Sequence, residues 1–245
     1  MSDSDNNANG PEEQVITSKQ DVGAMNSVAM VLPVNAKPME LIDALLKSHQ
    51  SLYQHIQEDP LLANVVKLVL ISACCLLIYG VIMGAFSGEL QWFVAPTKVL
   101  FGTFLSALLC FPSLYVLSAL GGADLDPMQA AAFLVSSVAL TGLLLVGFAP
   151  VAFVFTFSIE ALPFMGIVHL LIWGISLYFG MRYAIRGLAA FGGKDAMIMK
   201  IWVFIFVLTL LQMSTTLRPI LGSADYMFTT EKQFFLAHWF EALGN

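Results

Sequence analysis

Long, uninterrupted apolar runs fill this chain from about residue 61 onward, and polar residues gather mainly between them. A helix needs about 20 apolar residues to cross roughly 30 Å of hydrocarbon. The runs are continuous and do not alternate as membrane strands do, which favours helices. They predict five membrane-spanning helices, at residues 61–86, 96–120, 128–155, 164–181 and 196–217.

An amphipathic pattern precedes the first run. Within residues 38–58, Leu41, Leu45 and Leu52 recur at helical spacing, and Pro38 suits a first helical turn. A single helix over 38–58 is therefore predicted. It either lies in the membrane interface or packs on the ends of the spans.

The chain divides by composition into four segments, which together predict an all-α, polytopic membrane bundle. Residues 1–36 are rich in Ser, Asp, Asn, Gly and Glu and predict a disordered cytoplasmic tail. Residues 37–59 carry the amphipathic helix, and residues 60–222 carry the five spans. Residues 223–245 predict a short aromatic helix at the interface, too short to span.

Composition supports lipid as the main solvent. Of 245 residues, 58% are hydrophobic and only 11% are charged, whereas a soluble domain has about 25% charged residues. The net charge is −6 without a basic face, so no nucleic-acid partner is expected. The three cysteines lie inside apolar runs without metal-ligand spacing, and neither a metal nor another cofactor is predicted.

Lys and Arg are unequally divided between the two ends of the predicted spans. One end holds Lys37, Lys47, Lys67, Arg182, Arg186, Lys194 and Lys200, and the other holds Lys98, Arg218 and Lys232. Because cytoplasmic loops carry the excess of basic residues, the N-terminus is predicted in the cytoplasm. The C-terminal aromatic helix then lies on the far side of the membrane. Lys67, near the start of the first span, is expected to extend to the headgroups.

Glycines four residues apart predict a helix-packing surface on the first span. Gly80, Gly84 and Gly88 allow the close backbone approach on which helix association in lipid relies. The partner is either another span of this chain or a second copy of it. Gly166 and Gly174 in the fourth span offer a smooth counterpart.

Two prolines fall inside predicted spans. Pro112 removes a backbone donor in the second span, and either Ser113 or Thr103 is placed to help satisfy freed groups. Pro150 interrupts the third span, where it either kinks or ends the helix. Each kink is either a packing bend or part of a cavity lining.

Three further polar residues form a candidate structural or ligand site. His169 lies inside the fourth span and is either a neutral imidazole bonded to a hydroxyl or backbone group, or a proton-relay or ligand position. Gln212 lies deep in the fifth span and is expected to have an interhelical partner. Arg218 precedes Pro219 at the exit of that span. It either anchors to lipid phosphate, bonds carbonyls at broken helix ends, or belongs to a ligand site.

The motifs "CFPSLY" (110–115) and "LRPILG" (217–222) give the chain a family resemblance. It resembles a group of uncharacterised bacterial five-span proteins that are similar to the Yip-type (Ypt-interacting-protein) membrane family in span count and topology. The resemblance covers residues 61–245. It implies a non-enzymatic, membrane-shaping or scaffolding protein of the bacterial inner (plasma) membrane, and it transfers no catalytic residues.

Two functional hypotheses follow. The first is a non-enzymatic scaffold or subunit of an inner-membrane complex, with lipids, other subunits or further copies of itself as partners. Residues 1–59 would then meet a cytosolic partner. The second is a channel or transporter with a path near Pro112, His169, Gln212 and Arg218. Acid–base pairs, nucleophile–base sets and phosphate-binding loops are not recognisable, so an enzyme is not expected.

Overall fold

The computed structural model describes residue 32 and residues 36–58, 62–87, 91–158, 162–193 and 196–216. Across these residues the protein is all-helical, with seven α-helices and no strand. They are α2 (Pro38–Lys47), α3 (His49–Glu58), α4 (Leu62–Ser87), α5 (Gln91–Leu120), α6 (Pro127–Ser158), α7 (Leu162–Ala190) and α8 (Ala196–Thr216). Most of the predicted N-terminal tail, Gly88, Arg218 and the predicted aromatic helix over 223–245 lie outside the described residues.

Four helices are long and apolar enough to cross a membrane, over Leu62–Ala85, Trp92–Leu120, Pro127–Thr156 and Phe164–Gly187. These four correspond to the first four predicted spans. The apolar stretch of α8 that lies within the described residues, Met197–Met213, is shorter than these four. The fifth crossing therefore stays a prediction.

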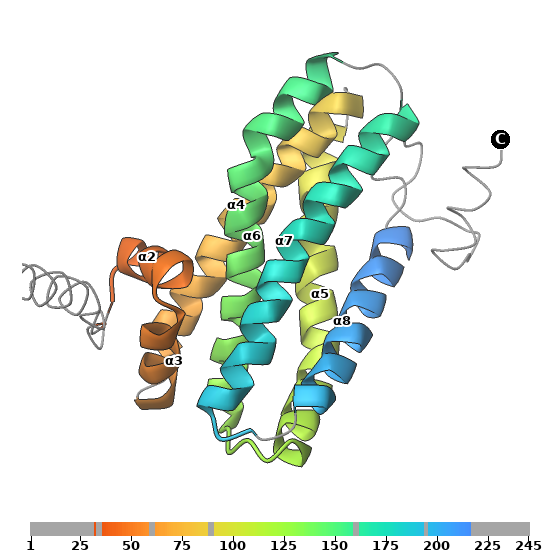
Figure 1. Ribbon diagram of the computed structural model, residues 1–245. Coiled ribbons are helices and arrows are strands. Elements are labelled where there is room, and N and C mark those ends of the chain that lie inside the picture. Colours follow the sequence, from red (N-terminus) through yellow and green to blue (C-terminus); the bar gives the residue numbers. More distant parts are fainter. Residues whose placement is uncertain are drawn as a thin grey trace, which may run out of the picture.

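Helices that follow one another along the chain run antiparallel, whereas α4 and α6, which pack against each other, run parallel (Figure 1). α4 contacts both α5 and α6, while α7 packs on α6 and α8 packs on α5. The connection from α5 to α6 meets the one that follows α7, because the Asp124 amide donates to the Phe191 carbonyl at 3.2 Å. Gly122 and Gly192 have φ angles of 81° and 80°, which only glycine adopts readily, and they allow both helices to end in tight turns.

The amphipathic segment is two helices, and the prediction of one helix over 38–58 is wrong. α2 ends where the Ser48 amide donates to the Ala44 carbonyl at 3.0 Å, and α3 begins where the Ser48 carbonyl accepts from the Ser51 amide at 3.1 Å. The serine hydroxyl can hydrogen-bond nearby backbone groups in non-helical conformations, so a helix break at Ser48 costs little free energy. The break lets both apolar faces reach the bundle, since Leu45 and Leu52 are fully buried.

Neither proline ends its helix. α5 runs through Pro112 to Leu120, and α6 runs through Pro150 to Ser158. Of the two alternatives predicted at Pro150, a kink or a helix end, the structure rules out the end. A proline removes only one hydrogen bond of the ladder, and neighbouring helices hold the rest in place. The predicted kinks at the two positions stay predictions.

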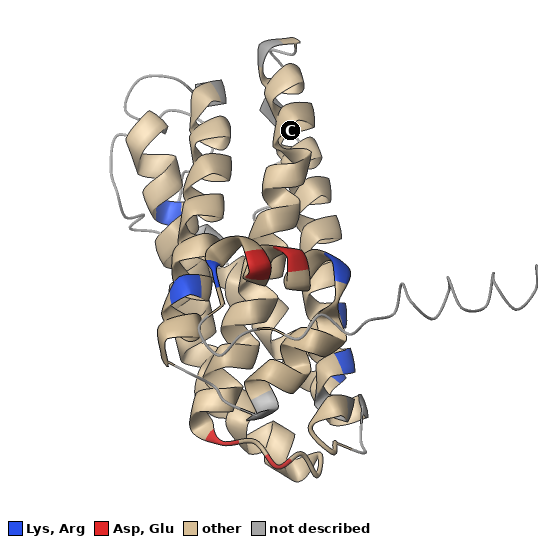
Figure 2. Ribbon diagram, turned by 90° about the vertical axis from the view of Figure 1, so that its left-hand side faces the viewer, with Lys and Arg blue, Asp and Glu red and all other residues tan. Residues whose placement is uncertain are grey.

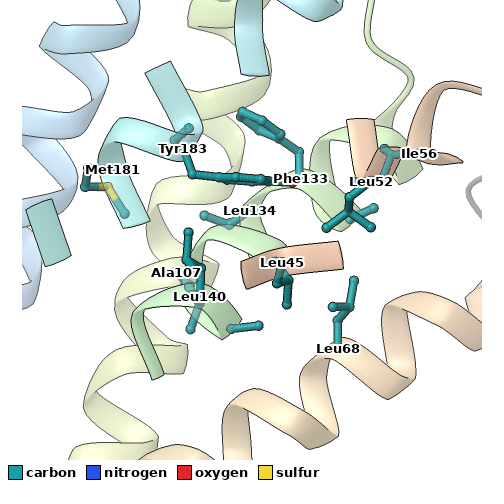
Figure 3. Close-up of a cluster of buried hydrophobic side chains, with 14 of the residues drawn as sticks. Leu45, Leu52, Ile56, Leu68, Ala107, Phe133, Leu134, Leu140, Met181 and Tyr183 are labelled. Carbon is teal, nitrogen blue, oxygen red and sulfur yellow. The ribbon is translucent and has the colours of Figure 1, made fainter. Parts of the chain in front are cut away.

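One apolar cluster joins the N-terminal helices to the bundle (Figure 3). Leu45 and Leu52 point toward the same interior as Phe133 of α6 and Tyr183 of α7. α2 and α3 are thus packed against α4, α6 and α7 rather than lying apart from them. Because the first four predicted spans supply most of this cluster, the N-terminal helices and the bundle share one core.

Candidate functional site

His169 is held by a tyrosine from a neighbouring helix. Its ring lies on α7, is 2% exposed, and places Nδ1 2.9 Å from the hydroxyl of Tyr79 on α4. The two rings meet edge to face with centroids 5.7 Å apart. Of the predicted alternatives, this contact matches an imidazole bonded to a hydroxyl. Sequence reasoning had not singled out Tyr79, because its partner lies 90 residues away.

The second ring nitrogen of His169 differs from the first. Nε2 is buried and has no hydrogen-bond partner in the described part of the chain. A buried imidazole nitrogen without a partner is costly, and such atoms commonly meet water or a ligand. Which nitrogen carries the proton depends on the direction of the Tyr79 contact. If Tyr79 donates to Nδ1, Nε2 is a donor, and in the other tautomer Nε2 is an acceptor.

The structure gives less detail for the other predicted site residues. Gln212 is half-buried near the end of α8, and Arg218 lies outside the described residues. Pro112 and Pro150 are both exposed on the surfaces of their helices.

Near Pro112, the Cys110 carbonyl joins two helices. It accepts from the Ser113 hydroxyl at 2.8 Å and from Trp202 Nε1 on α8 at 3.2 Å. Ser113 therefore bonds to the Cys110 carbonyl and not to the Leu108 carbonyl, which is the one that Pro112 leaves without its helical donor. Thr103 instead donates to the Val99 carbonyl at 2.8 Å. The fully buried Trp202 pins α8 to α5 at this point.

Several glycines allow helices to approach closely. Of the glycines that the sequence singled out, Gly80 is the one for which the structure describes such an approach. A Cβ added at Gly80 would lie 2.5 Å from Cα of Pro96, so α4 touches the backbone of α5 there. Gly84 is buried, and Gly88 is outside the described residues. The predicted counterpart is wrong, because a Cβ at Gly166 or Gly174 would meet nothing within 4 Å.

Three other glycines make close contacts that the sequence did not reveal. Gly142 faces Cys75, and Gly180 faces Thr141 so tightly that a Cβ would collide with its hydroxyl. Gly187 lies against the ring of Phe133. None of these three has another glycine four residues away in the sequence, so a search for glycines at four-residue spacing did not find them. Gly180 and Gly187 are seven apart, which is the helical repeat that could have drawn attention to them.

Aromatic rings dock α3 onto the bundle. The Tyr53 hydroxyl donates to the Tyr183 carbonyl at 2.8 Å, and the two rings lie 4.7 Å apart. Phe133 stacks on Tyr183 at 5.9 Å, and His49 meets Tyr183 edge to face at 5.3 Å. Burial raises the pKa of the Tyr53 hydroxyl well above its usual range, and the nearby Arg186 guanidinium opposes this only partly.

A polar chain fixes the segment before α2. Lys67 Nζ donates to the Ala36 carbonyl at 2.8 Å and lies 3.4 Å from Asn64 Oδ1. Asn64 Nδ2 in turn lies 2.8 Å from His55 Nε2. The expected extension of Lys67 to lipid headgroups is therefore not what the structure has. Its ammonium group points toward the N-terminal helices.

Hydroxyl groups inside α6 bond to their own helix. Ser136, Ser137 and Thr141 each donate to the carbonyl four residues earlier, at 2.7, 3.0 and 2.9 Å. This arrangement satisfies the hydroxyl locally and leaves a small side chain for helix packing. No group of three or more His, Cys, Asp or Glu side chains suited to a metal ion occurs among the described residues.

Comparison with known proteins finds no matching family model, no matching curated protein and no matching solved structure. The fold and the site themselves define a class, that of helical proteins with several helices fit to span a membrane. Within this class the chain is marked by a docked N-terminal helix pair and by a buried histidine–tyrosine contact.

Proposed function

We propose that this chain is an integral membrane scaffold or a subunit of a larger membrane complex, without a catalytic centre of its own. The observation that carries the proposal is the contrast between the inside and the outside of the bundle. Inside, glycines, short hydroxyl residues and rings are used for close helix packing. Outside, α5, α7 and α8 present large apolar side chains, among them Phe93, Leu171 and Phe204 at 79%, 61% and 68% exposure.

In the proposed arrangement α8 is the fifth span. Antiparallel packing of α5 and α8, pinned by Trp202, supports a crossing by α8. In Figure 2 the described charged residues gather in the middle and lower parts of the bundle, around α2 and the connection after α5, while the upper helical turns are tan. Arg182 and Arg186 in α7 and Lys200 in α8 lie toward the end of the bundle that carries the connection after α5. Basic residues favour the cytoplasm, so we place this end there and the C-terminus on the far side.

The proposed location is the inner membrane of a bacterium, in keeping with the resemblance to the five-span, Yip-type group. The docked pair α2–α3 offers a cytosolic partner a rigid surface, since its inner face is already packed on the bundle. Lipids, other subunits or further copies of this chain would cover the apolar faces of α5, α7 and α8.

Gentle extraction of the full chain from its native membrane, followed by mass spectrometry of the intact particle, tests this proposal. We expect a discrete assembly with a fixed number of chains. The same protein expressed alone in a foreign membrane is the control. An assembly in both membranes means a homo-oligomer, and an assembly only in the native one means a heteromeric complex. A monomer in both would refute the scaffold.

One observation favours a second candidate, a channel or transporter. His169 Nε2 is a buried polar atom without a described partner, at membrane depth between α4 and α7. In this candidate, His169 lines a path that includes Pro112, Gln212 and Arg218. Flux into liposomes would be compared for the wild type, His169→Ala and Tyr79→Phe. A fall in flux for His169→Ala would support the path, and no wild-type flux with a panel of ions would reject it.

A further inference from the structure

The outward face of α7 changes from apolar to basic within a few turns. Leu171, Ile175 and Tyr178 are 61%, 44% and 59% exposed, and they recur three or four residues apart. Arg182 and Arg186 continue the same stripe and are also exposed. Residues at this spacing lie above one another on a helix. A single line of side chains therefore runs from lipid-facing hydrophobes to two guanidinium groups.

The depth of the two arginines matches the boundary of the hydrocarbon. The apolar span of α7 covers Phe164–Gly187, so its midpoint falls near residue 175. At about 1.5 Å per residue, Arg182 begins about 10 Å and Arg186 about 16 Å from that midpoint. The hydrocarbon reaches about 15 Å from the bilayer centre. In the structure the Arg182 guanidinium lies against the Tyr178 hydroxyl, one turn nearer the midpoint, and extension of this long side chain would bring it toward the level of Arg186.

Protein charges do not account for the two guanidinium groups. Within the described residues neither arginine forms an ion pair with a carboxylate, and the ion pair found there joins Lys47 to Asp43 at 2.9 Å. Arg182 Nη1 instead lies 3.4 Å from the Tyr178 hydroxyl, at the end of the apolar stripe. Neither arginine lies in the last turn of α7, so the negative end of the helix dipole does not explain them either.

We infer that Arg182 and Arg186 form a binding site for the headgroup of an anionic phospholipid. Two guanidinium groups one turn apart match a phosphate group, because each presents a planar fork of donors. Tyr178 begins only about 4 Å from the midpoint, within the hydrocarbon, and the acyl chains run along Tyr178, Ile175 and Leu171. The inference rests on the membrane placement of the proposed function but not on its scaffold role.

The test uses the purified full chain in a neutral detergent, with bound lipids counted by mass spectrometry of the intact protein. Phosphatidylglycerol and phosphatidylcholine with the same acyl chains are titrated in turn. The variants are the double substitution Arg182→Gln/Arg186→Gln and the charge-keeping Arg182→Lys/Arg186→Lys. Lys47→Gln is the matched control, since it removes a cation already neutralised by Asp43.

The wild type is expected to prefer phosphatidylglycerol. Each basic residue near an anionic surface contributes roughly a fivefold preference. The double glutamine variant should therefore lose roughly 25-fold in preference, while the lysine variant keeps most of it and Lys47→Gln is unchanged. Thermal stability in lipid-free detergent should not move in the double glutamine variant, which separates lipid binding from a merely structural role.

Three results would overturn the inference: no wild-type preference, an equal loss in Lys47→Gln, or displacement of the lipid by millimolar inorganic phosphate. The last result would mean that the arginines bind free phosphate. The same spectra report the number of protein chains. A monomer that still prefers phosphatidylglycerol would exclude the homo-oligomeric form of the scaffold and leave the lipid site standing.

Discussion

Replacing Gly80 by alanine tests how closely α4 and α5 are packed. The added Cβ would lie 2.5 Å from Cα and 3.1 Å from N of Pro96. These are backbone atoms within the helix α5, so no side-chain rotation can relieve the overlap. Ordinary carbon–carbon contacts lie at about 3.5–4.0 Å. The two helices must therefore move apart by about 1 Å at this crossing.

Two opposing contributions to the free energy of unfolding determine the expected loss of stability. Forcing an extra methyl into a packed interior costs about 1–3 kcal/mol. Exchanging glycine for alanine inside a helix returns about 0.5–1 kcal/mol. Gly80→Ala should therefore lower the free energy of unfolding by about 0.5–2 kcal/mol. Gly174 is the matched control, because it lies in a helix where a Cβ would meet nothing within 4 Å. Gly174→Ala should be neutral or slightly stabilising.

The measurement is reversible unfolding in mixed micelles with increasing dodecyl sulfate, followed by circular dichroism and tryptophan fluorescence. The informative quantity is the difference between the two variants, in which the helix-propensity term cancels. That difference is expected at about 1–3 kcal/mol. Equal stabilities of Gly80→Ala and Gly174→Ala, within about 0.5 kcal/mol, would refute a close backbone approach at Gly80.

Two further predictions concern single hydrogen bonds between helices. Tyr53→Phe removes the bond to the Tyr183 carbonyl and should destabilise the docked α3 by about 1 kcal/mol, seen as faster proteolysis of the N-terminal helices. Because burial raises the pKa of Tyr53, the folded state holds this proton more tightly than the unfolded state, and the stabilisation is present at neutral pH and lost as pH rises above about 10. Tyr53→Phe should weaken this alkaline loss, and an unchanged loss would contradict the assignment. Trp202→Phe removes the bond to the Cys110 carbonyl and leaves a void, and should lower the unfolding free energy by about 1–3 kcal/mol, whereas Trp92→Phe, at a site 44% exposed, should change it by less than about 0.5 kcal/mol.

The local sequence pattern predicted the long helices well because a backbone surrounded by lipid has few conformations that satisfy its hydrogen bonds. Where water is excluded, every backbone amide and carbonyl must find a partner within its own segment, so a long apolar run becomes a helix. The first four spans follow this rule. At Pro150 the sequence left open whether the helix is kinked or ended, and α6 runs through to Ser158. The amphipathic segment lies outside this rule, and there the pattern predicted one helix where the structure has two, broken at Ser48.

The candidate site was predicted only in part, because sequence spacing describes one helix at a time. His169 stood out as an ionisable residue in an apolar run, but its partner Tyr79 lies on another helix. Gly80 stood out by its spacing, but the chain's fold chose Pro96 as its neighbour and left Gly174 open. Nothing in the local pattern distinguishes a glycine that meets a helix from one that does not.

The sequence by itself determined that the described chain is helical and where its four longest apolar helices lie, because these depend on local composition and on the solvent. The tertiary structure alone decided which helices touch. The Tyr53 hydroxyl meets a carbonyl 130 residues away, and Trp202 meets one 92 residues away. Such contacts depend on how several nearly uniform apolar surfaces fit together, and that fit is a property of shape that no single helix carries in its pattern.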